Sequence, residues 1–114
     1  MNIVNLTKQT TPKIPWKKIK EKILGKKYEL GIILSGEKRL KNLNKKYRKK
    51  DKKIEVLSFP YSKDEGEIYI DIRQKKERLA FLFIHGLLHL KGLKHGEKME
   101  KLEQLYYNKL HESR

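Results

Sequence analysis

Three of the four histidines in this 114-residue chain fall within one stretch, His85-Gly86-Leu87-Leu88-His89-Leu90-Lys91-Gly92-Leu93-Lys94-His95. His85 and His89 are spaced i, i+4, so both imidazoles would leave the same face of a helix about one turn apart. Gly92 tolerates left-handed backbone angles and can end that helix, after which the reversed chain can bring His95 back to the pair. Three neutral imidazoles with an open fourth position are typical of a catalytic zinc site. We therefore expect His85, His89 and His95 to bind one Zn²⁺ per chain.

For any one of these histidines, a hydrogen-bonded core residue is the simpler interpretation. For all three it is weaker, because two of them lie in the most hydrophobic segment, where unpaired imidazoles would cost free energy. The fourth histidine, His111, has no such companions and is interpreted as a surface residue. The spacing therefore favours a metal site over coincidence.

The residue after the first histidine excludes one familiar chemistry. Metallopeptidases with the pattern H-E-x-x-H place a glutamate there as the general base. This chain has Gly86, which cannot accept a proton. Gly86 either leaves room for a bulky substrate beside the metal or allows close packing against a neighbouring strand, and the sequence does not decide between the two.

The flanking sequence predicts strands that alternate with helices. The histidine helix is apolar nearly all round after Leu79, which is typical of a helix buried in the middle of a domain. Ser35 is expected to cap an earlier helix whose inward residues are Leu40, Leu43 and Tyr47. The expected elements are strand Asn2–Leu6, helix Trp16–Leu24, strand Tyr28–Leu34, helix Ser35–Tyr47, strand Glu55–Phe59 stopped by Pro60, loop Tyr61–Gly66, strand Glu67–Ile72, helix Gln74–Leu90, and a covering helix Gly96–His111 with Met99, Leu102, Leu105, Tyr106 and Leu110 on one face.

This order predicts an α+β fold for residues 1–114 as a single domain. We expect a mixed β-sheet of about four strands, and a central helix that carries H-x3-H as in zinc hydrolases. The apolar run from Leu79 to Leu90 is interrupted by His85, Gly86 and His89, so it is not expected to span a membrane. The N-terminus lacks the pattern of a signal peptide, and there are no cysteines, so a cytoplasmic protein is expected.

Charge points to a polyanionic partner. Lysine and arginine number 29 against 14 aspartates and glutamates, which gives a formal net charge of +15. Such an excess favours nucleic acid or an anionic membrane surface and opposes tight self-association, so a monomer is expected. The basic residues are densest from Lys38 to Lys53, a segment without the large apolar anchors of a membrane-surface helix, so RNA is preferred. The candidate RNA contacts are Lys45, Lys46, Lys49 and Lys50.

Three blocks together resemble one known family. Residues His85 to His95 are similar to H-G-x-L-H-L-x-G-x-D-H, the signature of the YbeY family of metal-dependent endoribonucleases. Residues Leu43 to Asp51 resemble that family's L-N-x-x-Y-R-x-x-D, and Val56 to Pro60 read V-L-S-F-P as the family does. Gly66-Glu67-Ile68 resembles its G-D-I strand. The blocks stand in the family's order, which makes the resemblance more specific than the histidine pattern alone.

The resemblance implies zinc ligation by His85, His89 and His95, and a catalytic role for Arg48 in the active-site cleft. It further implies hydrolysis of RNA phosphodiesters in ribosomal RNA maturation, at the 3′ end of small-subunit rRNA, and in ribosome quality control, with rRNA or the small ribosomal subunit as partner. A guanidinium suits the role of Arg48, because it can bind phosphate with two nitrogens. The general base stays open, with Glu55 and Glu67 as candidates. Lys94 departs from the family, which has aspartate before the third histidine.

Two other functions are weighed against the nuclease. One is a non-catalytic RNA-binding ribosome-assembly factor, in which a structural zinc fixes the last helix and the basic face binds RNA. The other is a metallopeptidase, which ranks last because of Gly86.

Overall fold

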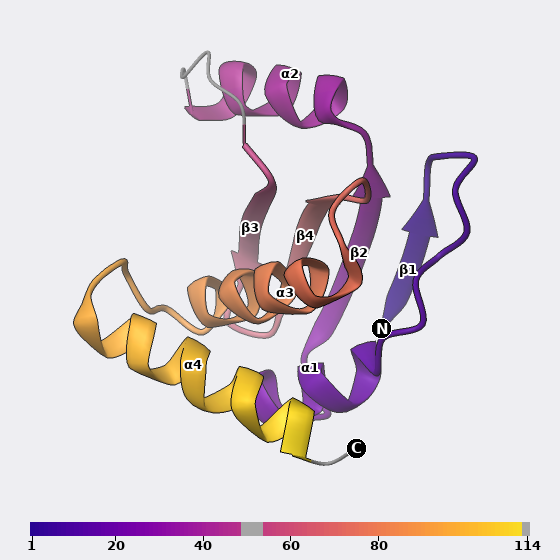
Figure 1. Cartoon of the computed structure of the whole chain (residues 1–114). Helices are drawn as coiled ribbons and strands as arrows, with labels where there is room; N and C mark the ends of the chain where they lie inside the picture. Colours follow the sequence, from indigo (N-terminus) through magenta and orange to yellow (C-terminus); the bar gives the residue numbers. More distant parts are fainter. Residues whose placement is uncertain (49–53, 113–114) are drawn as a thin grey trace.

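The computed structural model of the chain describes residues 1–48 and 54–112, and for Arg48 and Glu112 it describes the backbone alone. It is an α+β fold in which four strands form one mixed sheet (Figure 1). The elements are β1 (Asn2–Asn5), α1 (Trp16–Leu24), β2 (Glu29–Ser35), α2 (Glu37–Arg48), β3 (Val56–Ser62), β4 (Glu65–Asp71), α3 (Lys76–Leu90) and α4 (Glu97–Glu112). No helix in these described ranges is long and apolar enough to cross a membrane.

The strands lie in the order β1-β2-β4-β3. β2 runs parallel to both β1 and β4, and β3 pairs antiparallel with β4. Each parallel pair is joined through a helix, as such crossovers require: α1 lies between β1 and β2 in the chain, and α2 between β2 and β4. The expectation of a mixed sheet of four strands is therefore confirmed.

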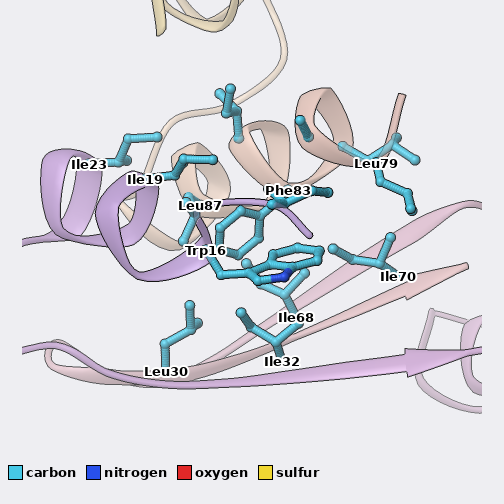
Figure 2. Close-up of a cluster of buried hydrophobic side chains, with 14 of the residues drawn as sticks. Trp16, Ile19, Ile23, Leu30, Ile32, Ile68, Ile70, Leu79, Phe83 and Leu87 are labelled. Atoms are coloured by element: carbon cyan, nitrogen blue, oxygen red, sulfur yellow. The ribbon is translucent and has the colours of Figure 1, made fainter. Parts of the chain in front are cut away.

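Helix α3 lies across one face of the sheet, with α1 and α4 beside it (Figure 1). Its residues Phe83, Leu87 and Leu79 are almost fully buried, as the apolar pattern predicted. They pack with Trp16 and Ile19 of α1 and with the apolar side chains that β2 and β4 direct to this face (Figure 2). The strand residues labelled there are Leu30, Ile32, Ile68 and Ile70. The helix that carries two of the histidines is thus fixed by the main hydrophobic core.

Helix α2 contacts β3 and β4. Leu40 of α2 is fully buried, and Leu57 and Ile33 are buried on the sheet face opposite α3, because successive strand residues alternate between faces. Tyr47 was expected to face inward, but it is 58% exposed and makes an edge-to-face contact with the partly buried Phe59, 5.7 Å between ring centroids. That prediction was wrong: Tyr47 lies in the last turn of α2, where its neighbours Lys45 and Lys46 are exposed as well.

Four further local predictions need correction. Strand β3 does not stop before Pro60 but continues to Ser62, which an outer strand with a single partner permits. The expected loop Tyr61–Gly66 shrinks accordingly, because β4 begins at Glu65. Ser35 does not cap α2: it is the last residue of β2, and its hydroxyl finds no partner among the described residues. Leu105 of α4 is 47% exposed rather than inward.

Candidate metal centre

The three histidines converge. His85 and His89 leave one face of α3, and His95 approaches them from the loop before α4. One ring nitrogen of each lies within 4.8 Å of the others, and Nε2 of His85 is 3.1 Å from Nε2 of His89. Two nitrogens bound to one tetrahedral zinc at 2.0–2.1 Å would stand about 3.3 Å apart. The spacing of the pair therefore matches that of two ligands on one ion.

The turn at Gly92 brings the chain back. Gly92 has φ +107°, in the region that favours glycine. Its N–H donates to the carbonyl of His89 at 2.9 Å, and the Leu93 N–H donates to that of Leu88 at 3.0 Å. These two bonds form a Schellman motif, which ends α3 and satisfies carbonyls of its last turn. The same turn places the Leu93 carbonyl 3.0 Å from Nδ1 of His89.

The Nδ1 atoms of His85 and His89 each have a hydrogen-bond acceptor. A backbone carbonyl can only accept, so Nδ1 of His89 must carry the proton that it donates to Leu93. Nδ1 of His85 donates to Oε1 of Glu103 at 3.2 Å, and the Glu103 side chain is only 7% exposed. If each ring carries a single proton, on Nδ1, both lone pairs are on Nε2, and these two atoms lie 3.1 Å apart. This arrangement fits a cation between them, with Glu103 and the Leu93 carbonyl fixing the rings from behind.

Gly86 brings the histidine helix close to the sheet. A Cβ at Gly86 would lie 3.1 Å from side-chain atoms of both Ile68 and Ser58. The Ser58 hydroxyl donates to the Gly86 carbonyl at 3.0 Å, which ties β3 directly to α3. Of the two interpretations left open by the sequence, close packing against the strands is therefore the one that the contacts favour. A larger residue at this position would require the Ile68 and Ser58 side chains to shift.

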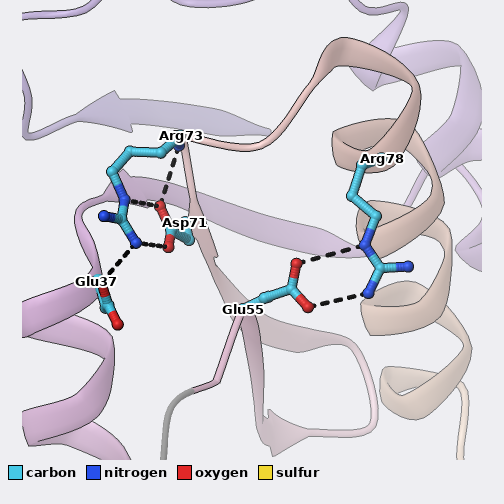
Figure 3. A network of polar contacts seen from close by, with 5 residues as sticks. All are labelled: Glu37, Glu55, Asp71, Arg73 and Arg78. Carbon is cyan, nitrogen blue, oxygen red and sulfur yellow. Dashed lines mark hydrogen bonds and ion pairs between the residues drawn. The ribbon is translucent and has the colours of Figure 1, made fainter.

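An open cleft of about 690 Å³ lies beside the cluster and is lined by all three histidines. Glu100 and Glu103 from α4 line it as well, together with Glu55 and Arg78. Arg78 donates from Nη2 and Nε to the two carboxylate oxygens of Glu55, at 3.0 and 3.4 Å (Figure 3). Arg78 offsets the charge of Glu55, so Glu100 and Glu103 are the acidic residues of the cleft without an arginine or lysine beside them in its lining.

Of the two glutamates predicted as candidate general bases, one lines the cleft and the other does not. Glu55 lines the cleft, but Glu67 alternates with Ile68 along β4 and so points to the face away from α3. There it accepts a hydrogen bond from the hydroxyl of Tyr61, and this raises the pKa of Tyr61 to about 12. Glu67 is therefore not placed to act as a base at the histidines.

The lysines described near the end of α2 are not among the residues that line the cleft. Lys45 and Lys46 are exposed near the end of α2, and neither lines the cleft. Arg48 ends α2, and its side chain lies outside the described part of the structure. Lys49 and Lys50 also lie outside the described residues. Lys94, which stands where the family pattern has aspartate, is exposed, and the histidines converge without that carboxylate.

Two residues of the site were not predicted from the sequence. Arg78 precedes His85 by seven residues, so it leaves the same helix face two turns earlier, and that spacing could have indicated it. Glu103 bonds to His85 across 18 residues and two helices, and no local pattern marks it.

This fold and site define a protein with a cluster of three histidines that could hold a metal ion, two of them on a buried helix, beside an open cleft. The chain belongs to the YbeY family: the family model described as "Endoribonuclease YbeY" matches residues 3–111. Two relatives called Endoribonuclease YbeY are similar to it. That of Pelagibacter ubique is 39% identical, over 77% of this chain and 73% of the relative, and that of Rubrobacter xylanophilus is 40% identical, over 66% of this chain and 58% of the relative.

A solved structure supports the same fold. The solution structure of a protein from Thermotoga maritima superimposes with a TM-score of 0.66 at 26% sequence identity, covering 99% of this chain and 91% of the other. The family model and the named relatives confirm the sequence-based assignment to the family.

Replacing Gly92 by alanine tests the turn. We expect the free energy of unfolding to fall by about 1–2 kcal/mol, because a Cβ is strained at positive φ. Metal affinity should fall with it, since the turn aims the Leu93 carbonyl at His89. Chemical denaturation and metal titration measure the two effects.

Gly31→Ala is the matched control, because a Cβ there meets only the flexible side chain of Glu67, 3.2 Å away at the nearest atom. Its stability and metal affinity should stay close to wild type. Equal losses in the two variants would mean that the Gly92 turn has no special role.

Proposed function

We propose that this chain is a zinc-dependent endoribonuclease that hydrolyses RNA phosphodiesters in ribosomal RNA maturation, at the 3′ end of small-subunit rRNA, and in ribosome quality control. The observation that carries the proposal is the convergence of His85, His89 and His95 at an open cleft, in a chain whose relatives are named endoribonucleases. The net charge of +15 supports a polyanionic substrate. We further propose that residues 1–114 act as one domain and as a monomer.

In this proposal the three histidines hold the ion, and Glu103 and the Leu93 carbonyl keep two of their rings in the metal-binding orientation. A bound zinc ion would lower the pKa of water to about 7 and polarise a phosphoryl oxygen. Ser58 and Gly86 keep β3 against α3, so that the floor of the cleft stays in place while substrate enters.

Basic residues would supply the affinity for RNA. Arg48 is proposed to bind phosphate and to neutralise the charge that develops on it, as the family resemblance implies. Lys45, Lys46, Lys49 and Lys50 are proposed to bind further phosphates of the backbone, which would give affinity and salt dependence without sequence specificity.

The two rival functions fit the site less well. A structural zinc has four protein ligands and a closed shell, whereas this cluster has three histidines beside an open cleft of about 690 Å³. A metallopeptidase of the H-E-x-x-H type needs an acid where Gly86 packs against Ile68 and Ser58.

The deciding experiment measures metal content per chain and cleavage of a single-stranded RNA, for wild type and His89→Ala. We expect near one zinc per chain in wild type, and loss of both metal and cleavage in the variant, because a three-ligand site does not survive the removal of one imidazole. His111→Ala is the matched control, since His111 contacts Tyr107 on α4 and is not a member of the cluster.

Each other outcome has a definite meaning. Bound metal with equal background cleavage in all three proteins would favour the non-catalytic RNA-binding factor. Absence of metal from the wild type after growth in zinc would overturn the proposed metal site. Zinc-dependent cleavage of an unstructured protein would revive the peptidase.

A further inference from the structure

One basic side chain in the cleft, that of Arg78, has no part in the proposed mechanism. Among the described residues that line the cleft, Arg78 is the only lysine or arginine. It leaves α3 on the same face as His85 but two turns earlier, which corresponds to about 10 Å along the helix axis. At that separation it is placed for a part of the substrate that lies next to the reacting group, not on it.

The guanidinium of Arg78 is oriented on one side and open on the other. Nε and Nη2 donate to the two oxygens of Glu55, at 3.4 and 3.0 Å. Nη1 has no hydrogen-bond partner in residues 1–48 and 54–112, and the side chain is 48% exposed. A guanidinium has five N–H groups in a rigid fork, so the edge formed by Nη1 and the second proton of Nη2 stays available. Figure 3 shows Nη1 pointing away from Glu55.

The ion pair between Arg78 and Glu55 by itself contributes little to stability. Ion pairs between partly exposed side chains contribute only about 0–1 kcal/mol to stability, and here 48% of Arg78 and 31% of Glu55 is exposed. Both oxygens of Glu55 accept from the arginine, so this carboxylate orients a cation and is not placed to serve as the general base. Two oxygens of a phosphate match the open edge of the fork.

We propose that Arg78 binds a backbone phosphate adjacent to the one that reaches the histidines, with Glu55 as the positioning residue that fixes the guanidinium. The inference rests on the proposed function, because it assigns a second phosphate site to the same RNA substrate. It differs from the role of Arg48 in that it concerns binding of the neighbouring nucleotide and not the chemical step.

Equilibrium binding of a labelled oligouridine, followed by fluorescence anisotropy over a range of salt concentrations, tests the site. The full chain is used as purified and again in EDTA, so that binding is measured with and without turnover. Arg78→Gln is expected to weaken binding by about tenfold. It should also reduce the slope of log K against log salt by about 0.7, the value for one phosphate contact on a single strand.

Two pairs of variants distinguish a specific phosphate site at Arg78 from an effect of net charge on RNA binding. Lys18→Gln removes the same charge from an exposed position on α1, outside the cleft, and should leave the slope unchanged. Arg78→Lys keeps the charge but loses the fork, so it should keep the slope and lose several-fold in affinity. Arg73→Lys makes the same exchange at an arginine bonded to Asp71 and Glu37, outside the cleft, and should bind as wild type does (Figure 3).

The proposal is overturned if Arg78→Gln and Lys18→Gln change the affinity and slope equally, or if the wild type does not bind oligouridine. A wild type that binds with the expected dependence on Arg78 but never cleaves RNA would contradict the proposed nuclease and leave the phosphate site standing.

Discussion

Phe83→Ala is expected to lower the free energy of unfolding by about 3–5 kcal/mol, a large share of the stability of a small domain. Phe83 lies on the buried side of α3 and is fully buried. Its ring forms a T-shaped contact with the ring of Trp16, with 4.9 Å between the ring centroids. Truncation removes both the apolar contacts and this aromatic pair, and it leaves a cavity that the surrounding strands cannot close. Urea denaturation followed by circular dichroism measures the loss.

Phe81→Ala is the matched control on the same helix. Phe81 lines the cleft and is only partly buried, so its truncation should cost less than half as much. Because Phe83 precedes His85 by two residues, its loss should also loosen the histidine cluster, and added zinc should recover part of the stability by mass action. Equal losses in the two variants would contradict the central position of Phe83 in the core.

Glu103→Ala is expected to weaken zinc binding by about 10- to 100-fold. The Glu103 carboxylate accepts from Nδ1 of His85 at 3.2 Å, which holds the ring with Nε2 toward the other histidines. Without it the ring can rotate or take the other tautomer, and the negative charge behind the ligand is lost. Competition against a chromophoric chelator gives the affinity without reference to catalysis.

Glu100→Ala is the control that distinguishes the orientation of the His85 ring from the summed negative charge of the cleft. Glu100 also lies on α4 and lines the cleft, but it is exposed, and no hydrogen bond joins it to a histidine in the described structure. Its loss should change zinc affinity little. A similar loss in both variants would show that the carboxylates act through their summed charge, and Glu103→Gln, which keeps an acceptor, should then fall with them.

The sequence was sufficient wherever the structure depends on local spacing. The i, i+4 spacing of His85 and His89 placed both on one face of α3, and Gly92 marked the turn that returns His95. The apolar surround of Phe83 likewise indicated a buried helix. These features follow from helix geometry and from the backbone freedom of glycine, so they require no knowledge of the tertiary fold.

What the sequence could not provide depends on how elements cross. Glu103 meets His85 because α4 packs along α3, and Glu55 meets Arg78 across 23 residues because β3 begins beside the first turn of α3. Such pairings become visible only when the sheet order is known.

The outer position of Pro60 has a consequence for how the protein behaves in concentrated solution. A sheet with free margins can add strands from other copies, which is a common first step toward aggregates. Here one edge strand is β1, which is only four residues long. The other edge strand is β3, where Pro60 lacks an N–H and the register shifts between Pro60 and Ser62. A strand from another molecule would therefore find no long regular ladder to extend, and the mutual repulsion of chains with a net charge of +15 acts in the same direction.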